Sequence, residues 1–157
     1  MIYQEYINSV KSRFKSTKTD KIGGFDVDVA FIEIFKWKWL ATKLKISSYI
    51  SYAEKLDQKT ISDFSDACFL ASKKNYKGLP RGVQNGFASF IVIASEDIDF
   101  DAIAFAESRP KKHFAAFDMP VVVDLKKEKI YFYHGKPIWG SIYYRFFREF
   151  ITSNFDF

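Results

Sequence analysis

The sequence has little of what metal sites, disulfides and membrane segments need: among 157 residues there are one cysteine, two histidines and no long apolar run. A single cysteine, Cys68, excludes an internal disulfide. No apolar stretch approaches the roughly 20 residues that span a membrane. The first residues also lack the apolar centre of a signal peptide. These shortages predict a soluble, cytoplasmic protein that does not enter a membrane.

The shortage of histidine and cysteine also limits the chemistry. His113 and His134 with one thiol cannot complete the usual four-ligand zinc set, so we assign no metal site, and any other metal would need mainly carboxylate ligands. Cys68 lies on the apolar face of an expected helix, which is typical of a core residue rather than a nucleophile. No complete catalytic signature or cofactor motif is present, so the catalytic residues and cofactors stay unassigned.

Apolar residues, by contrast, make up 48% of the chain and aromatic residues 19%, which is enough for a substantial core. The hydrophobic pattern predicts one domain over residues 1–157, of the α/β or α+β class, with a mixed sheet of about five strands flanked by about four helices. Helices are expected at about 2–17, 61–75, 98–107 and from 137 onward, and strands at about 25–35, 36–46, 87–94, 119–125 and 130–133.

Three local features of this pattern lead to further expectations. The apolar phase slips within each of the first two strands, which predicts a bulge or bend in both. Thr60 and Asp63 resemble a capping box at the start of the second helix. The continuous apolar run of residues 87–94 predicts a central strand, joined to the strand at 119–125 by a helix in a right-handed βαβ unit.

Positive charge is unevenly distributed along a chain of formal net charge +5. The glycine-rich loop at 75–86 combines exposed backbone with cations, a mixture suited to phosphate, although its spacing is not that of a P-loop. We therefore predict a basic rim that binds anions, unless these side chains are only a solvated surface. The candidate residues are Lys73, Lys74, Lys77, Arg81, Lys111 and Lys112.

Carboxylates offer two weaker candidate sites. Glu96 and Asp124 follow two expected parallel strands, so they could share one edge of the sheet, or serve only as a helix cap and a turn residue. Asp26 or Asp28 could supply the first carboxylate of a metal-dependent nuclease. The next acid, Glu33, is followed by a lysine one position too far for strand alternation, so the nuclease pattern is incomplete.

The last helix has an apolar arc wider than one sheet face needs, which predicts a surface for a second subunit formed by Trp139, Tyr143, Tyr144 and Phe147. Two hypotheses about function follow. The first is a non-catalytic binding or interaction protein, a homodimer through this helix. The second is a protein that associates with nucleic acid or another anionic ligand, with a metal-dependent nuclease as its enzymatic version. The residues do not decide whether the protein is an enzyme.

Overall fold

The computed structural model describes residues 1–36, 42–75, 85–111, 116–135 and 141–157. Within these ranges the helices are α1 (Tyr3–Ser12), α2 (Gln58–Asn75), α3 (Phe100–Glu107) and α4 (Ser141–Phe155). The strands are β1 (Thr17–Ile22), β2 (Phe25–Lys36), β3 (Thr42–Tyr52), β4 (Asn85–Ser95), β5 (Ala116–Asp124) and β6 (Lys129–Tyr131).

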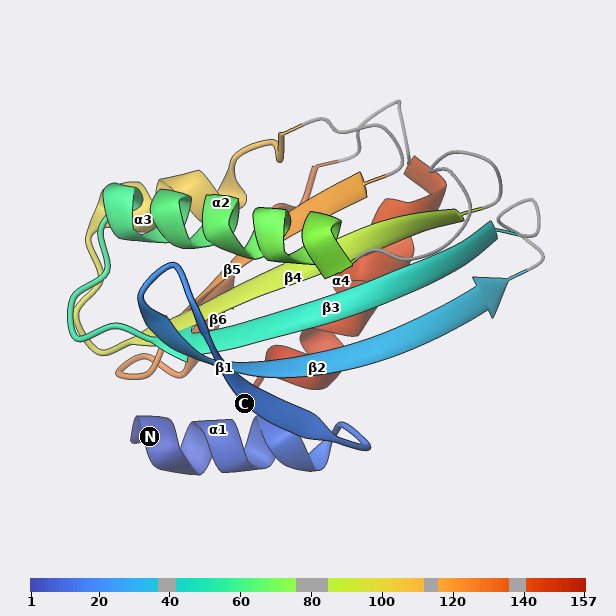
Figure 1. The fold of residues 1–157 in the computed structure, drawn as a ribbon. Coiled ribbons are helices and arrows are strands. Elements are labelled where there is room, and N and C mark those ends of the chain that lie inside the picture. Colours follow the sequence, from blue (N-terminus) through green and yellow to red (C-terminus); the bar gives the residue numbers. More distant parts are fainter. Residues whose placement is uncertain (37–41, 76–84, 112–115, 136–140) are drawn as a thin grey trace.

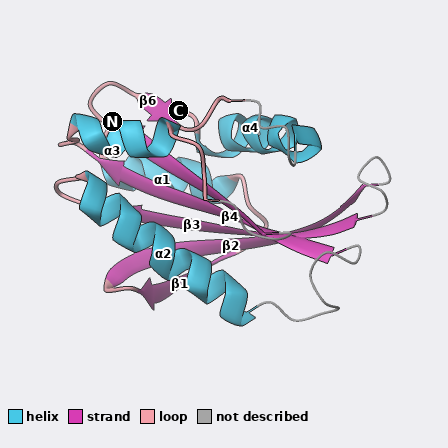
Figure 2. Ribbon diagram, turned by 90° about the horizontal axis from the view of Figure 1, so that it is seen from above, coloured by secondary structure: helices cyan, strands magenta, loops and turns pink. Residues whose placement is uncertain are grey.

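All the strands belong to one mixed sheet with the order β1-β2-β3-β4-β5-β6. The pairs β1–β2, β2–β3 and β5–β6 are antiparallel, whereas β3–β4 and β4–β5 are parallel. α2 and α3 connect the parallel strands and cover one face, and α1 and α4 cover the other (Figure 1 and Figure 2). The described part of the chain confirms a mixed sheet flanked by four helices, with six strands in place of about five.

Strand β1 begins at Thr17, the last residue of the predicted first helix, whereas α1 itself ends at Ser12. Its sequence TKTDKI has four exposed residues between two half-buried ones, so it carries no apolar alternation. Charged side chains are common on edge strands, where they discourage pairing with other chains. Lys18 is therefore a residue of a sheet edge, and the predicted helix of residues 2–17 is too long.

The turn between β1 and β2 depends on two glycines. Ile22 pairs with Phe25, so Gly23 and Gly24 form a two-residue turn, and both have positive φ angles, 59° and 86°. Turns of this kind fit the twist of a hairpin and favour glycine. A Cβ atom on Gly23 would lie 2.7 Å from Cβ of Ala67 in α2, whereas one on Gly24 would meet nothing within 4 Å. The hairpin therefore packs closely under α2.

Replacing each glycine by alanine separates the backbone effect from this close contact. Both substitutions place a side chain at positive φ, at a cost of about 1–2 kcal/mol. We expect Gly23→Ala to lower the free energy of unfolding further than Gly24→Ala, because only Gly23→Ala forces Ala67 and α2 to move. Denaturant unfolding measures both losses. Equal losses would mean that the hairpin is not held against α2.

The apolar side chains of β2 change face partway along the strand without a bulge. Val27 and Val29 belong to the core under α2, whereas Ala30 and Ile32 contact the core on the α4 side. Pairing of β2 with β3 nevertheless runs without interruption from Asp28 to Lys36. The predicted bulge in β2 is therefore wrong. The slip predicted in the second strand, between Trp39 and Leu44, lies mostly outside the described residues; from Lys43 onward β3 pairs continuously with β4.

The change of face reflects which helix covers each part of the strand. β2 has 12 residues, or about 40 Å at about 3.3 Å per residue. α2 has 18 residues, or about 27 Å at about 1.5 Å per residue. The helix is therefore too short to cover the strand, and β2 and β3 run past its end in both views (Figure 1 and Figure 2). Phe31 lies beyond this cover, and its side chain is 59% exposed.

Two element boundaries also differ from the prediction. β3 begins at Thr42 and continues to Tyr52, later than predicted. The tryptophans that suggested an earlier start lie outside the described residues. α2 begins at Gln58, and the Oδ1 atom of Asp57 accepts the backbone N–H of Thr60 at 2.8 Å. Asp57 is therefore the cap, and the predicted capping box is wrong because Thr60 already lies within the helix.

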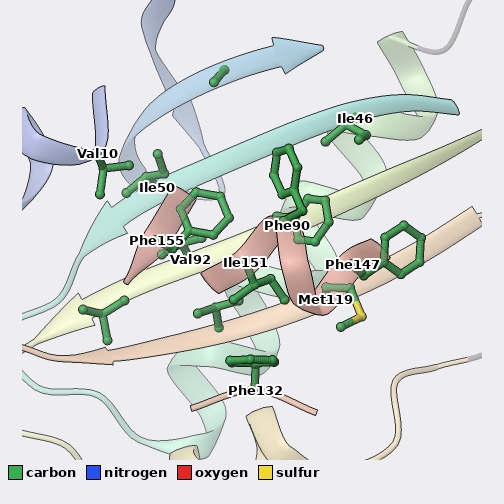
Figure 3. Close-up of a cluster of buried hydrophobic side chains, with 14 of the residues drawn as sticks. Val10, Ile46, Ile50, Phe90, Val92, Met119, Phe132, Phe147, Ile151 and Phe155 are labelled. Carbon is green, nitrogen blue, oxygen red and sulfur yellow. The ribbon is translucent and has the colours of Figure 1, made fainter. Parts of the chain in front are cut away.

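Strand β4 separates two apolar cores and confirms the predicted central strand. Every residue from 86 to 95 is buried, and alternate side chains enter the two cores. In the larger core, side chains from α1, α4 and the sheet gather around Phe90 (Figure 3). The ring of Phe90 stacks on that of Phe150 at 4.6 Å. Complete burial of such a side chain contributes about 1.5–3 kcal/mol. The aromatic side chains of this core therefore stabilise the packing of α1 and α4 on the sheet.

Polar contacts hold α1 against the sheet and the end of α4. The buried Tyr6 hydroxyl donates a hydrogen bond to the Phe155 carbonyl at 2.8 Å, and Nη1 of Arg13 donates to the Asp156 carbonyl at 2.6 Å. Burial raises the pKa of Tyr6, so its hydroxyl remains a donor. Lys11 forms an ion pair with Asp28 of β2 at 2.6 Å. These contacts hold α1 against the larger core, next to β2.

Candidate anion-binding groove

A groove of about 500 Å³ lies on the α2 face of the sheet, where the helix ends before the strands do. Its floor is formed by β2 and β3, one wall by β1, and the other by the last two turns of α2. We call this hollow the basic groove. It is lined by Lys18, Asp20, Lys21, Ile22, Val29, Phe31, Lys45, Ser47, Tyr49, Ala71, Ser72, Lys74, Asn75 and Phe87.

Positive charge dominates the basic groove, because four lysines line it against one aspartate. Lys18 lies 3.7 Å from Asp20, and Lys21 lies 3.3 Å from Asp26, with all four side chains largely exposed. Exposed ion pairs of this kind contribute little, typically about 0.2–1 kcal/mol. Lys18 can therefore exchange its partner for a more highly charged anion in the groove at small cost.

The lysines reach the groove from three different elements. Lys18 belongs to β1, Lys45 to β3 and Lys74 to the last turn of α2. Lys21 also borders the hollow, but it pairs in register with Asp26, so its side chain lies on the face opposite Lys18. Within the described ranges Lys74 is exposed and makes no ion pair, although its position also complements the helix dipole. Cations that surround a concave surface focus the electrostatic potential within it. The groove therefore attracts an anion, and the ammonium group of Lys74 is available to bind it.

Hydroxyl groups form the polar part of the floor. Ser89 Oγ donates a hydrogen bond to Ser72 Oγ at 2.7 Å, and Ser72 Oγ also shares a hydrogen bond of 2.7 Å with the Tyr49 hydroxyl. Burial raises the pKa of Tyr49, so the phenol is neutral at physiological pH. This chain of hydroxyls fixes the end of α2 to β3 and β4. It gives the groove a rigid floor without negative charge.

Only part of the predicted basic rim coincides with the groove. Lys74 lines it, and Lys73 is exposed in the same last turn of α2. Lys111 instead binds Asp66 at 2.8 Å, next to a separate small cavity. Lys77, Arg81 and Lys112 lie outside the described residues. Lys18, Lys21 and Lys45 were not among the predicted anion-binding residues, because β1 has no strand-like apolar pattern and Lys45 joins the groove only through the pairing of β3 with β2.

The carboxylates of the nuclease hypothesis are dispersed. Asp26 pairs with Lys21, and Asp28 pairs with Lys11 while also accepting a hydrogen bond from Thr19. Glu33 lies 3.8 Å from Lys43. It follows Asp28 by five residues in β2, so strand alternation places the two side chains on opposite faces of the sheet. Over the ranges that the structure describes, no three His, Cys, Asp or Glu side chains gather in a way that could hold a metal ion.

The predicted shared edge of β4 and β5 is present, but its aspartate serves a turn. Asp124 pairs in register with Ser95, next to Glu96. Its Oδ1 atom accepts the backbone N–H groups of Lys126 and Lys127 at 3.1 and 2.9 Å, and its Oδ2 lies 3.1 Å from Nζ of Lys127. The side chain of Glu96 is exposed. Asp124 therefore stabilises the turn between β5 and β6, and these contacts explain its presence without a ligand.

Neither Cys68 nor His134 lines the basic groove. Cys68 is buried in the core under α2, as predicted, and burial raises the pKa of its thiol, with nearby Asp118 acting in the same direction. His134 is exposed just beyond β6, and its ring centre lies 4.2 Å from that of Phe132. His113 lies outside the described residues.

The aromatic residues of α4 mostly contact the chain's own core. Phe147 is fully buried, and Tyr144 is nearly so. Tyr143 is half-buried, with its ring 5.1 Å from that of Phe117, and Trp139 lies outside the described residues. The apolar surface of Tyr144 and Phe147 is thus used within the chain, so a substitution there would disturb the core first. The homodimer stays a prediction.

A second cavity, about 50 Å³ in volume, lies between α2 and β5 beside the buried side chain of Asp118. Burial raises the pKa of Asp118 to about 7, while Lys111 acts in the opposite direction and Asp66 adds to the increase. The folded state therefore favours a protonated Asp118. This cavity is too small for a drug-sized ligand but large enough for a water molecule.

Asp118 should make stability depend on pH. Its folded pKa of about 7 lies above the ordinary value of 3.8, so the folded state binds more protons between these values. We expect the free energy of unfolding to fall as pH rises through this interval, by up to about 1.4 kcal/mol per pH unit, and then to level off. Asp118→Asn should remove this decline, whereas Asp63→Asn on the exposed side of α2 should keep it. Denaturant unfolding across the interval measures the slope, and an unchanged slope in Asp118→Asn would contradict the assignment.

Comparisons of the chain with protein-family models, with curated proteins and with solved structures gave no match. Within the described ranges, no helix is both long and apolar enough to cross a membrane. Function must therefore be inferred from the basic groove and its chemistry.

Proposed function

We propose that the protein binds a phosphate-bearing ligand in the basic groove. The observation that carries this proposal is the convergence of Lys18, Lys45 and Lys74, from β1, β3 and α2, on a hollow of about 500 Å³ that has one acidic residue in its lining. This volume falls within the usual range of ligand pockets, about 300–1,000 Å³. The proposal thus takes up the predicted binding of an anionic ligand, at a location different from most of the predicted rim.

The chemistry of the lining favours phosphate over an apolar ligand. Lysine ammonium groups bind phosphate oxygens as point charges and need no fixed planar geometry. Lys18 has an exposed carboxylate partner, Asp20, that a phosphate can replace. Ser47 adds a hydroxyl to the same lining. Together these groups can neutralise a multiply charged anion and satisfy its oxygens.

The proposal is for binding and includes no cleavage step. Catalysis of phosphate chemistry requires groups that position a nucleophile and stabilise the leaving oxygen. Asp26 and Asp28 are each paired with a different lysine, and Glu33 lies on the opposite face from Asp28. The described carboxylates thus do not form a reaction centre at the groove.

Neutralising two groove lysines tests the proposal. The probe is a fluorescently labelled abasic phosphodiester of about 10 residues, which presents phosphates without bases. We expect wild-type protein to bind it at low salt and to lose affinity steeply from about 50 to 200 mM salt. The double substitution Lys18→Gln and Lys74→Gln should weaken binding and reduce the steepness of the salt dependence, by about 0.7 in slope for each phosphate that the protein no longer neutralises.

A matched double variant, Lys59→Gln with Lys129→Gln, controls for net charge. Lys59 lies in the first turn of α2 and Lys129 on the opposite edge strand, so both are exposed and outside the groove. This variant should retain wild-type affinity and slope. Fluorescence anisotropy measures both quantities. Equal losses in the two double variants, or no binding to wild-type protein at low salt, would overturn the proposal.

A further inference from the structure

We infer that the ligand of the basic groove is a single-stranded nucleic acid, one base of which stacks on Phe31. This inference rests on the proposed function and goes beyond it by naming the ligand. Its starting observation is an exposed aromatic ring among cations. Phe31 lines the groove, and 59% of its surface is accessible. Among the described residues its ring lies within stacking distance of no other ring.

The position of Phe31 in the sheet leaves its ring accessible. The first residue of β1, Thr17, pairs with Ala30 of β2, so the pairing of the two strands stops one residue before Phe31. From Phe31 to Lys36 the described part of β2 pairs only with β3. The side chain also projects on the α2 face, beyond the end of that helix. A large apolar ring therefore lies at an open end of the groove without cover from the described chain.

Phosphate contacts are available around this ring. Phe31 pairs in register with Ser47, and Lys45 lies two residues away on β3, so alternation places Lys45 on the same face. Lys18 and Lys21 line the β1 side of the groove, and Lys74 lines the α2 side. Cations along a groove with an aromatic platform are the combination by which proteins bind single strands. Stacking supplies base affinity, and the cations follow the backbone.

The same features disfavour a duplex. A base can place its face on Phe31 only when it is not stacked between neighbours within a double helix. The volume of about 500 Å³ is that of a small-molecule pocket, enough for a nucleotide but not for a duplex. Phe35, four residues further along β2, is also partly exposed on the same face, about 13 Å away at about 3.3 Å per residue. Glu33 lies between the two phenylalanines on this face and pairs with Lys43, so Phe35 is a second, separate ring along the open edge.

The test uses substitutions of Phe31 and a labelled oligothymidylate of about 10 nucleotides. We expect Phe31→Ala to weaken binding by roughly 5- to 150-fold, which corresponds to the loss of one stacked base. The slope against salt should stay unchanged, because the phosphate contacts remain. Phe31→Trp should retain or increase affinity. Phe100→Ala provides the matched control, since Phe100 is 82% exposed at the start of α3 and lies outside the groove.

Three further probes separate this inference from the proposed function. The abasic phosphodiester should bind wild-type protein and Phe31→Ala equally, and a duplex of the same length should compete weakly. ATP should compete only at much higher concentration than the oligonucleotide. If Phe31→Ala binds oligothymidylate like wild type, or if the duplex or ATP competes as well as the single strand, the inference is overturned while phosphate binding stands. If the abasic probe and the oligothymidylate both fail to bind, both proposals fall.

Discussion

The structure depends on how helices cover a sheet that is longer than they are. β4 is buried on both faces, so each face of the sheet must carry helices. α2 and α3 supply one layer because they connect parallel strands, and α1 and α4 supply the other. α2 is shorter than β2 and β3, which leaves part of one face without a helix. The reversal of buried face in β2, the exposure of Phe31 and the basic groove all follow from this difference in length.

The charged residues around the uncovered face have a structural role as well as the proposed one. An edge strand with free backbone groups invites pairing with other chains, and charged side chains discourage it. Lys18 and Lys21 serve this purpose on β1, and Lys73 and Lys74 complement the dipole of α2. Neither role requires Lys18, Lys45 and Lys74 to surround one hollow that also has neutral hydroxyl groups in its lining. The structural roles therefore explain why cations occur on these elements but not why they converge.

The sequence predicts the centre of the fold better than its edges. The apolar run at Phe87–Ala94 and the helical stripe containing Cys68 identify β4 and α2, because burial imposes a strong pattern on both. β1 escapes prediction because an exposed edge strand buries too little to leave a pattern. The shift of phase at Phe31 and Ile32 resembles a bulge in sequence, but it arises from a change in helix cover, which depends on tertiary structure. The groove could therefore not be predicted, since it combines β1 with side chains that the sheet register and the end of α2 bring together.

The central claim is that ligand binding occurs at the basic groove, and an NMR titration locates binding most directly. Isotope-labelled protein would be titrated with a short single-stranded oligonucleotide while the backbone amide signals are followed. The account predicts chemical-shift changes in β1, around Phe31 of β2, from Lys45 to Tyr49 of β3 and in the last turn of α2, with the α4 face unchanged. Changes confined to the α4 face or to the β6 edge, with the groove amides unaffected, would contradict it.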